Sequence, residues 1–400
     1  MSNLLTEAKA LQGAIVKDRR YIHQNAELGM ELPVTSAYVI KRLEEMGYEP
    51  RIIAGSGVVA LAGGKKSGKT ILLRADMDAL PIVEENDLTY KSNTGNMHAC
   101  GHDMHAAMLL GAAKLLKAHE DEIEGTVKLM FQPAEERLSG AKTMIEEGIL
   151  ESPNVDAAAM IHVFSGMPMK AGTLVVSEGG YSTSSADMFH IDIQGKGGHG
   201  AMPQDSVDPL NVASHIFIAL QEIIAREVTP SNTAVITIGQ MHGGNAANIL
   251  PDTAFLEGSI RAFDKNDREL MRNRVVEISK GIAATFRAQA NVEFRMECPS
   301  VYNDASLSDL SIKVNRELLG ESNVITFKDI FPGGKMTGSE DFGFISEKVP
   351  SLMMALGGGS SEEGYPYPQH HPKVNFNEDI LYIGSAAYAN TAIKWLQSNK

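Results

Sequence analysis

The stretch that decides the fold runs from Thr70 to Pro81 and reads Thr-Ile-Leu-Leu-Arg-Ala-Asp-Met-Asp-Ala-Leu-Pro. Its first half, residues 70–76, is a largely apolar run that predicts a strand, and two acidic residues follow it closely. Similar runs at 126–132 and 156–163 predict two further strands, with helical patterns between them. Strands that alternate with helices indicate an α/β fold with a mostly parallel sheet.

The same patterns extend this α/β region toward both ends of the chain. Apolar residues that recur every three or four positions predict helices, and short apolar runs bounded by Gly or polar residues predict strands. We therefore expect helices at 4–29, 33–46, 104–118, 139–147, 306–319 and 378–397, and strands at 58–62, 324–327 and 351–356.

Residues 187–298 follow a different order: strand, helix, strand, strand, helix, strand. The first of these helices is expected to begin with Asp208 as N-cap and Pro209 as its first residue. The order βαββαβ is that of the ferredoxin-like split unit. We therefore predict an inserted lid or dimerisation domain at 185–299, within a catalytic metal-binding domain formed by 1–184 and 300–400.

Composition excludes several classes of protein. The chain has 400 residues, 43% of them hydrophobic, which is typical of a soluble globular protein with a sizeable core. Its formal net charge of -14 argues against binding to nucleic acid or to an anionic membrane. The first nine residues lack a signal-peptide pattern, and two cysteines give no disulfide framework, so we expect a cytoplasmic location.

One phosphate-binding pattern is present. Residues 63–70 read Gly-Gly-Lys-Lys-Ser-Gly-Lys-Thr, which satisfies the P-loop consensus. A P-loop needs a helix to begin at its Lys-Thr pair, because the helix N-terminus faces the phosphate. Here Thr70 begins the strand-like run instead. We interpret the segment as a turn between two strands.

Residues 97–105 concentrate side chains that bind metals. The stretch reads Met-His-Ala-Cys-Gly-His-Asp-Met-His and contains His98, Cys100, His102 and His105. Thiolate and imidazole are the donors that zinc-like ions prefer, and Cys100 and His102 can face one ion from a loop. The alternative is a surface loop with solvated histidines and a small buried cysteine.

The ends of the predicted strands carry further candidates. Asp78 follows the strand at 70–76, Glu135 and Glu136 follow that at 126–132, and His162 ends that at 156–163. Ligands of α/β sheets bind beyond the carboxyl ends of the strands, where these side chains would converge. One glutamate could bind a metal while its neighbour takes a proton from water. Alternatively, adjacent glutamates begin a helix, and a histidine at a strand end is simply hydrogen-bonded.

A histidine pair, His370 and His371, lies in a loop rich in Gly, Tyr and Pro. Such a loop does not fill a regular core, so the pair is either exposed or functional. We favour a functional site, because loops on an α/β frame commonly carry the chemistry.

Eight short motifs together carry a family resemblance. In this order they are similar to the motifs of the metal-dependent amidohydrolases that include hippurate hydrolase, N-acyl-amino-acid deacylases and plant auxin-conjugate hydrolases. These belong to the superfamily of aminoacylase and glutamate carboxypeptidase, whose two-metal α/β domain carries an inserted ferredoxin-like domain. The motifs are Asp76–Pro81, Cys100–His105, Gln132–Glu136, Ile161–His162, Gly197–His199, Asn248–Asp252, Ser339–Phe342 and His370–Pro372.

The resemblance implies a role for each matching residue. Glu135 would be the general base, Asp78 a carboxylate that supports a ligand, and His199 a residue that polarises the scissile carbonyl in a neighbouring active site. Asn248 and Arg261 would hold the substrate carboxylate, a task that suits a forked guanidinium. The implied ligands of two divalent ions (Zn, Mn, Ni or Co) are Cys100, His102, Glu136, His162 and His370, with Cys100 as a bridging candidate.

The chain departs from the family pattern at two places. Gly200 and Gln204 replace an alanine and a histidine that family members often have, which leaves the specificity of that loop open. His371 stands where relatives usually have Asn or Ser. The choice of His370 over His371 therefore depends on the alignment alone.

The implied activity is hydrolysis of an N-acyl-L-amino acid to a carboxylate and a free amino acid, by a homodimer or higher homo-oligomer. Deacetylation of N-acetyldiaminopimelate or a dipeptidase or carboxypeptidase activity would use the same centre. Two other classes remain as remote alternatives: a P-loop nucleotide-binding protein, and a non-catalytic metal-binding module. Paired Glu135 and Glu136 argue against the latter, because a closed structural site needs no base.

Overall fold

The computed structural model describes residues 4–399, and the chain divides into two compact units. The first unit comprises Met1–Ser182, Val301–Met336 and Asp341–Lys400. The second comprises Thr183–Ser300 and Thr337–Glu340. Their assignment as catalytic domain and as lid or dimerisation domain stays a prediction. Among the described residues, no helix is both long and apolar enough to cross a membrane.

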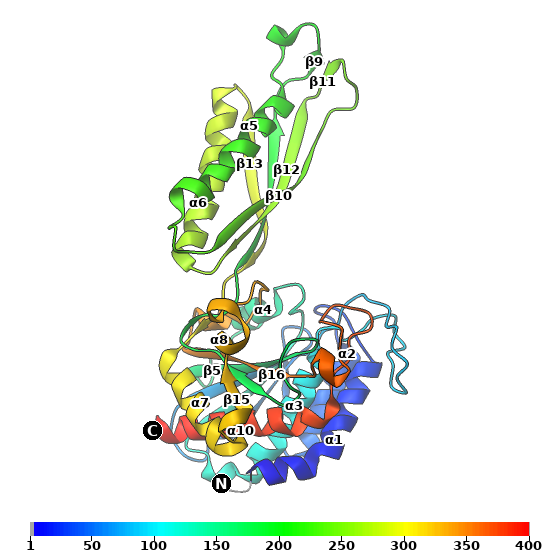
Figure 1. Cartoon of the computed structure of the whole chain (residues 1–400), viewed down its shortest axis with the longest axis vertical. Coiled ribbons are helices and arrows are strands. Elements are labelled where there is room, and N and C mark those ends of the chain that lie inside the picture. The colour runs from blue at the N-terminus through cyan, green and yellow to red at the C-terminus, as the bar shows by residue number, and fades with distance from the viewer. Residues whose placement is uncertain (1–3, 400) are drawn as a thin grey trace. The chain divides into compact units, whose positions relative to one another are not determined.

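The first unit is built on an eight-stranded mixed sheet (Figure 1). Its central strands β4, β3, β5 and β16 are parallel neighbours, whereas β1–β2, β2–β4 and β16–β6 are antiparallel. This confirms the predicted α/β class. In spatial order the strands are β1 (Arg51–Ile53), β2 (Gly57–Gly63), β4 (Thr126–Gln132), β3 (Thr70–Asp76), β5 (Ala157–Phe164), β16 (Ser351–Gly357), β6 (Leu174–Val176) and β15 (Val324–Thr326).

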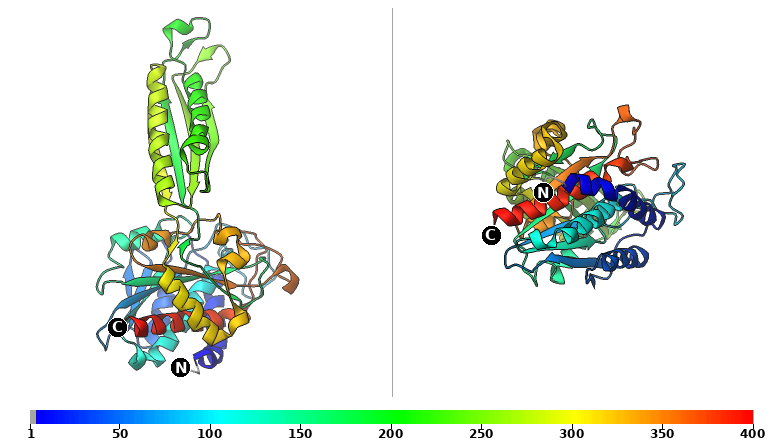
Figure 2. Two further views of the ribbon diagram at one scale, coloured as in Figure 1. Left: turned by 60° about the vertical axis from the view of Figure 1, so that its left-hand side comes forward. Right: turned by 90° about the horizontal axis from the view of Figure 1, so that it is seen from below.

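Helices cover both faces of this sheet, because its central strands are buried on both sides. Leu73 of β3 packs into the larger core and its neighbour Leu72 into the smaller one. The views in Figure 2 show α1, α3 and α10 lying along one face. That face carries α1 (Leu4–Gln24), α2 (Pro33–Glu45), α3 (His102–Ala118), α7 (Ala305–Leu319) and α10 (Leu381–Ser398), and the other carries α4 (Gly140–Glu146), α8 (Phe327–Ile330) and α9 (Gly343–Ser346).

The first helix ends earlier than the sequence predicts. We expected it to reach residue 29, but α1 ends at Gln24. Glu27 instead accepts hydrogen bonds from the Val34 and Thr35 amides at the start of α2, at 3.1 and 2.8 Å. Gly29 has a φ of 66°, which a helix does not allow. A side-chain cap for the next helix therefore replaces the last turn.

The P-loop-like segment is a turn between strands, as predicted. β2 ends at Gly63 and β3 begins at Thr70, so no helix follows the Lys-Thr pair. Gly63 and Gly64 adopt φ values of 80° and 77°, which reverse the chain. The nucleotide-binding alternative lacks the helix on which it depends.

The second unit is a four-stranded antiparallel sheet with strand order β10-β12-β8-β13, covered on one face by α5 and α6 (Figure 1). Asp208 caps α5 by accepting from the Leu210 amide, as expected. The order of elements confirms the ferredoxin-like prediction. It runs β8 (Ala186–Gln194), α5 (Pro209–Glu222), β10 (Ala234–Gly243), β12 (Thr253–Ala262), α6 (Lys265–Thr285) and β13 (Gln289–Cys298).

Smaller elements complete the two units. In the second unit β9 (Gly198–His199) pairs with β11 (Ile249–Leu250), and in the first β7 (Gly180–Tyr181) pairs with β14 (Tyr302–Asn303).

Candidate metal centre

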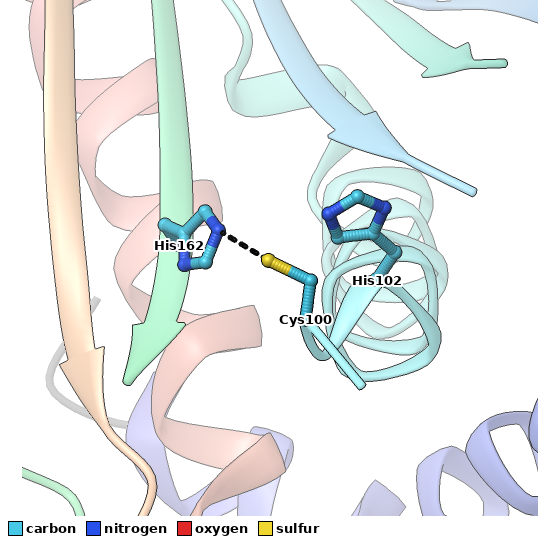
Figure 3. Close-up of side chains that lie close together, drawn as sticks. All are labelled: Cys100, His102 and His162. Atoms are coloured by element: carbon cyan, nitrogen blue, oxygen red, sulfur yellow. Dashed lines mark hydrogen bonds between the residues drawn. The ribbon is translucent and has the colours of Figure 1, made fainter. Parts of the chain in front are cut away.

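The carboxyl ends of β3, β4 and β5 meet at one edge of the first unit, and most predicted ligands lie there. Cys100, His102 and His162 form one cluster, in which the three ligand atoms lie within 4.8 Å of one another. Figure 3 shows His162 on its strand facing Cys100 and His102 at the start of a helix. Cys100 Sγ and His162 Nε2 are 3.5 Å apart. Widely separated parts of the sequence thus place three donors around one point.

Gly101 explains how two ligands one residue apart face the same point. Its φ of 92° turns the chain sharply between Cys100 and His102, where α3 begins. A Cβ atom at this position would lie 2.4 Å from Val163 Cγ2, so a side chain would not fit. The metal-binding stretch therefore requires glycine here for both conformation and space.

A second cluster shares the cysteine. Cys100, Glu136 and His370 also place their ligand atoms within 4.8 Å of one another. His370 Nε2 lies 3.5 Å from Glu136 Oε1. Cys100 thus belongs to both clusters, so one thiol lies within reach of both groups of possible ligands.

The structure distinguishes between the two adjacent histidines. The His370 backbone has a φ of 66°, and its amide donates to the Ala99 carbonyl at 2.9 Å, next to Cys100. Such a φ is unusual for a residue with a side chain. His371 instead stacks on Tyr367, and its Nδ1 accepts from the Lys373 amide at 3.0 Å. Only His370 of the pair joins the cluster.

Asp78 organises the glutamate turn that follows β4. Its two carboxylate oxygens accept from the amides of Glu135 and Glu136, at 3.0 and 3.1 Å. Its carbonyl oxygen lies 2.8 Å from His102 Nδ1, so this nitrogen is the donor and Nε2 remains for the cluster. The structure thus gives Asp78 contacts with three neighbours of the centre, as a supporting carboxylate requires.

Glu135 lies beside the cluster. Its Oε2 and Glu136 Oε1 are each 3.8 Å from His102 Nε2. Ala134 before them has a φ of 55°, so the turn that presents both glutamates carries backbone strain. Two neighbouring glutamates at the same distance from His102 could take different roles, one binding an ion and the other carrying a proton.

Unpaired buried atoms test whether these residues fit a metal. His102 Nε2 and Glu136 Oε1 are buried, and neither has a hydrogen-bond partner among residues 4–399. A buried polar atom without a partner costs about 1 to 3 kcal/mol. A divalent cation would satisfy both, and cysteine, histidine and glutamate together are ligands that Zn²⁺ and similar ions accept. The residues fit a metal.

Burial and neighbouring charges together shift the pKa values of the site. It raises the pKa of the Cys100 thiol well above its usual value, and the nearby Glu136 charge adds to the effect. Burial also raises the pKa of Glu136 itself. Burial would lower the pKa of His102, but Asp76, Cys100 and Asp78 together outweigh burial, so this pKa lies well above its usual value. An ion that bound Cys100 would have to displace the thiol proton, so the affinity of such a site for metal should rise with pH.

The sequence identifies His105 as one of four metal-capable side chains, but it assigns no specific role to His105 or to Asp76, although both lie in the quoted motifs. Both side chains are fully buried, and Asp76 Oδ1 lies 2.6 Å from His105 Nδ1. Burial would raise the pKa of Asp76, but Arg74, His102 and His105 together hold it well below its usual range. Position was the available signal: Asp76 ends a strand, and His105 follows His102 by three residues and shares its helix face.

The other predicted residues belong to the second unit. His199 lies on β9 opposite Ile249 of β11, and the Asn248 carbonyl accepts from the Gly200 amide at 2.9 Å. Arg261 lies near the far end of β12, eight residues from Thr253, which is about 27 Å along a strand. The second unit thus brings His199 and Asn248 together but not Arg261. The roles of all three stay predictions.

Comparisons with known proteins identify relatives of this chain. The chain is 40% identical over 389 residues to IAA-amino acid hydrolase ILR1-like 2 of Arabidopsis thaliana, covering 96% of this chain and 85% of the relative. It is 38% identical over 397 residues to hippurate hydrolase of Campylobacter jejuni subsp. jejuni, covering 99% and 100%.

A solved structure, described as a dinuclear metal binding peptidase of the M20 family from Bacillus subtilis, superposes with a TM-score of 0.80 at 32% identity, over 97% of this chain and 99% of that one. The resemblance inferred from the eight motifs is thereby confirmed. The model of peptidase family M20/M25/M40 matches residues 72–394, and the chain belongs to this family.

Proposed function

We propose that this protein hydrolyses the amide bond of N-acyl-L-amino acids, releasing a carboxylate and the free amino acid. The observation that carries the proposal is the pair of clusters that share Cys100, with Glu135 beside them. A structural metal site is closed and needs no base. The named activities of the two hydrolase relatives, which act on acyl amino acids, support the same reaction.

The ligand set we propose is Cys100, His102, Glu136, His162 and His370, with Cys100 shared between two ions. Bound divalent ions supply Lewis acidity, which lowers the pKa of water to about 7 and polarises a carbonyl. Zn, Mn, Ni and Co all suit these donors. Asp78 fixes the orientation of His102 through its carbonyl oxygen.

Glu135 moves the proton in this proposal. Its carboxylate takes a proton from the attacking water and then donates it to the leaving nitrogen, so that the departing group is a neutral amine. The Glu135 side chain is largely buried and close to His102. The hydrogen bond from the Glu135 backbone amide to the Asp78 carboxylate holds the turn in place. Its neighbour Glu136 faces His370 and serves the metal instead.

Recognition of the substrate is assigned to the second unit. Asn248 and Arg261 would bind the substrate carboxylate, and His199 would donate to the oxygen of the scissile carbonyl as negative charge develops there. His199 is exposed on β9, so its ring is accessible to a ligand. Gly200 and Gln204, in the same loop, are where we expect side-chain specificity to differ from that of relatives.

We propose further that the protein is a homodimer. β10 is an edge strand, and Val235 and Met241 on it are 48% and 40% exposed. On the adjoining helix α5, Phe217 and Ile218 are 39% and 66% exposed. An unpaired edge beside exposed apolar side chains is suited to pairing with a second copy. Cys100 and Cys298 form no disulfide, which suits the reducing cytoplasm, where we expect the protein.

Mixed dimers test whether His199 acts in the partner's site. His199→Ala and Glu135→Gln should each be nearly inactive alone and partly active when refolded together, because a mixed dimer contains one complete site. Mixed dimers without activity would restrict His199 to its own chain or remove it from the reaction.

A substrate panel tests the reaction itself. The metal-loaded protein should release amine from acetyl, benzoyl or indole-acetyl amino acids, measured as free amino acid. N-acetyldiaminopimelate and dipeptides belong in the same panel, because turnover of these alone would identify a deacetylase or dipeptidase. No release from any of them by a protein with full metal content would contradict the proposal.

A further inference from the structure

The parallel ladder between β3 and β5 stops before either strand ends. Residues 71–74 pair with 157–160, yet β3 continues to Asp76 and β5 to Phe164. In a parallel strand, alternate amides point to opposite neighbours. The Ala158 amide bonds on the β16 side, so Ile161 and Val163 present their amides on the side of β3, beyond the last strand pair.

Two side chains occupy the places of the missing strand partners. Tyr388 of α10 comes first: its hydroxyl accepts from the Ile161 amide at 2.8 Å and donates to the Arg74 carbonyl at 2.7 Å. His105 of α3 comes next, and its Nε2 accepts from the Val163 amide at 2.8 Å. The sheet therefore opens between β3 and β5, and a hydroxyl and an imidazole bridge the opening.

The hydrogen bonds fix the tautomer of His105. A backbone amide can only donate, so His105 Nε2 carries no proton and the proton is on Nδ1. Nδ1 donates to Asp76 Oδ1 at 2.6 Å, and Arg74 binds the other oxygen of Asp76 at 2.6 Å. One ring thus connects the end of β3 to the end of β5 through two directional bonds.

This connection lies directly behind two of the proposed ligands. The His105 ring centroid is 4.5 Å from that of His162 and 5.4 Å from that of His102. His162 immediately precedes Val163, the residue that His105 holds. Asp76, His102 and His105 could themselves surround an ion. However, both nitrogens of His105 and both oxygens of Asp76 are already hydrogen-bonded.

We propose that His105, oriented by Asp76, is a positioning residue that sets the distance between His102 and His162. It does so by replacing the strand partner of Val163 where the sheet opens. The ion bound by Cys100, His102 and His162 would depend on it, whereas Glu136 and His370 would not. This inference rests on the proposed ligand set and not on the identity of the substrate.

Two short amides separate the roles of the two ring nitrogens. In His105→Asn the side-chain amide nitrogen lies where Nδ1 was. The hydrogen bond to the Asp76 carboxylate is therefore kept, and the hydrogen bond from the Val163 amide is lost. In His105→Gln the amide oxygen reaches the position of Nε2 and can accept from Val163. We expect His105→Asn to weaken binding of the ion at Cys100, His102 and His162 by about 10- to 100-fold, the usual loss when a residue that orients a metal ligand is removed. We expect His105→Gln to retain most of the wild-type affinity.

The metal affinity of these variants can be measured with cobalt and without substrate. The two readouts are competition with a coloured chelator and the absorption bands of the cysteine-bound ion. Tyr388→Phe is the matched control, since it removes the other bridge, which holds Ile161 and not the neighbour of His162. It should lower stability and leave cobalt affinity unchanged. Wild-type affinity in His105→Asn, or equal losses in Asn and Gln, would overturn the proposal. Because the experiment does not measure hydrolysis, an error in the proposed substrate would not affect the result.

Discussion

The two halves of the candidate metal centre are built differently. Cys100, His102 and His162 come from a strand end and the start of a helix, and the side chain of His102 is fully buried. His370 comes from a loop, with its side chain 54% exposed and its backbone at a φ of 66°. The buried half (Cys100, His102 and His162) is thus built mainly on a strand and a helix, whereas the exposed half (Cys100, Glu136 and His370) includes an exposed loop residue.

Hydrogen bonds increase this difference. His102 Nδ1 donates to the Asp78 carbonyl and His162 Nδ1 to the Val163 carbonyl, at 2.8 and 2.7 Å, so both rings have a fixed orientation. Ligands held in place before binding lose less conformational freedom when the ion arrives. We therefore expect the buried half to bind its ion first and release it last.

The largest expected effect is at Glu135, which lies beside both halves and is assigned to neither ion. Glu135→Gln should lower turnover by about 10² to 10⁴, the usual contribution of general acid and base catalysis, because an amide cannot carry the proton. Metal content should stay at the wild-type level, as measured by elemental analysis. Loss of metal in this variant would mean that Glu135 and Glu136 have exchanged roles.

Cys100 belongs to both halves, so its loss should remove the difference between them. Cys100→Ser replaces a soft thiolate by a weak hydroxyl donor, and affinity for both ions should fall by more than the roughly 10- to 100-fold cost of losing an outer partner. Cys298→Ser is the control, because Cys298 is buried in the second unit and is expected to be silent. Calorimetric titration with metal measures the affinity of both variants. Wild-type affinity in Cys100→Ser would exclude the thiol as a ligand.

Substitution of His370 tests the exposed half alone. His370→Ala should bind about one ion per chain where the wild type binds about two, since the ligands of the buried half remain. His371→Ala should keep both ions, because His371 stacks on Tyr367 and bonds the Lys373 amide away from the cluster. If His371→Ala is the variant that loses an ion, the loop carries the ligand at the other position.

The smallest expected effect is on the stability of the fold near the buried half, and it concerns His23. His23 of α1 bonds Asp103 of α3 and Glu84, at 2.9 and 3.1 Å. Burial would lower the pKa of His23, but these two carboxylates raise it. A raised pKa means that the protonated ring stabilises the fold. This contribution is complete below about pH 6.5, the usual histidine value, and is lost as the pH rises through the raised pKa.

His23→Gln should therefore cost about 1.5 kcal/mol of unfolding free energy at acidic pH, and less as the pH rises above the folded pKa. Urea unfolding of both proteins at several pH values, with a chelator present to remove metal effects, gives the difference directly. A difference that is constant from acidic to alkaline pH would mean that the charge on His23 contributes nothing.

The sequence predicts the buried half better than the exposed half. Strands 70–76 and 126–132 match the structure to the residue, because apolar runs end where polar residues begin. Parallel strands bring those ends together, so convergence of Asp78, Glu135 and His162 follows from the fold class. The choice of His370 depends on one backbone angle and one stacked tyrosine, which have no local sequence signal.

The contact between Asp76 and His105 was not predicted, for a different reason. Their contact exists because β3 and β5 separate beyond residues 74 and 160, and this depends on the packing of α10 against the sheet. The separation is a property of three segments that are distant in the chain. Periodicity within any one of them does not reveal it.

Metal titration of the stripped protein tests the central claim most directly. After dialysis against a chelator, zinc or manganese is added stepwise, and bound metal and hydrolysis of an N-acyl amino acid are measured on the same samples. We predict no activity without metal, a first tight equivalent at the buried half, and activity that rises as a second, weaker equivalent fills the half containing His370. Hydrolysis by the metal-free protein, or full activity at one equivalent, would contradict a shared-thiolate centre for two ions.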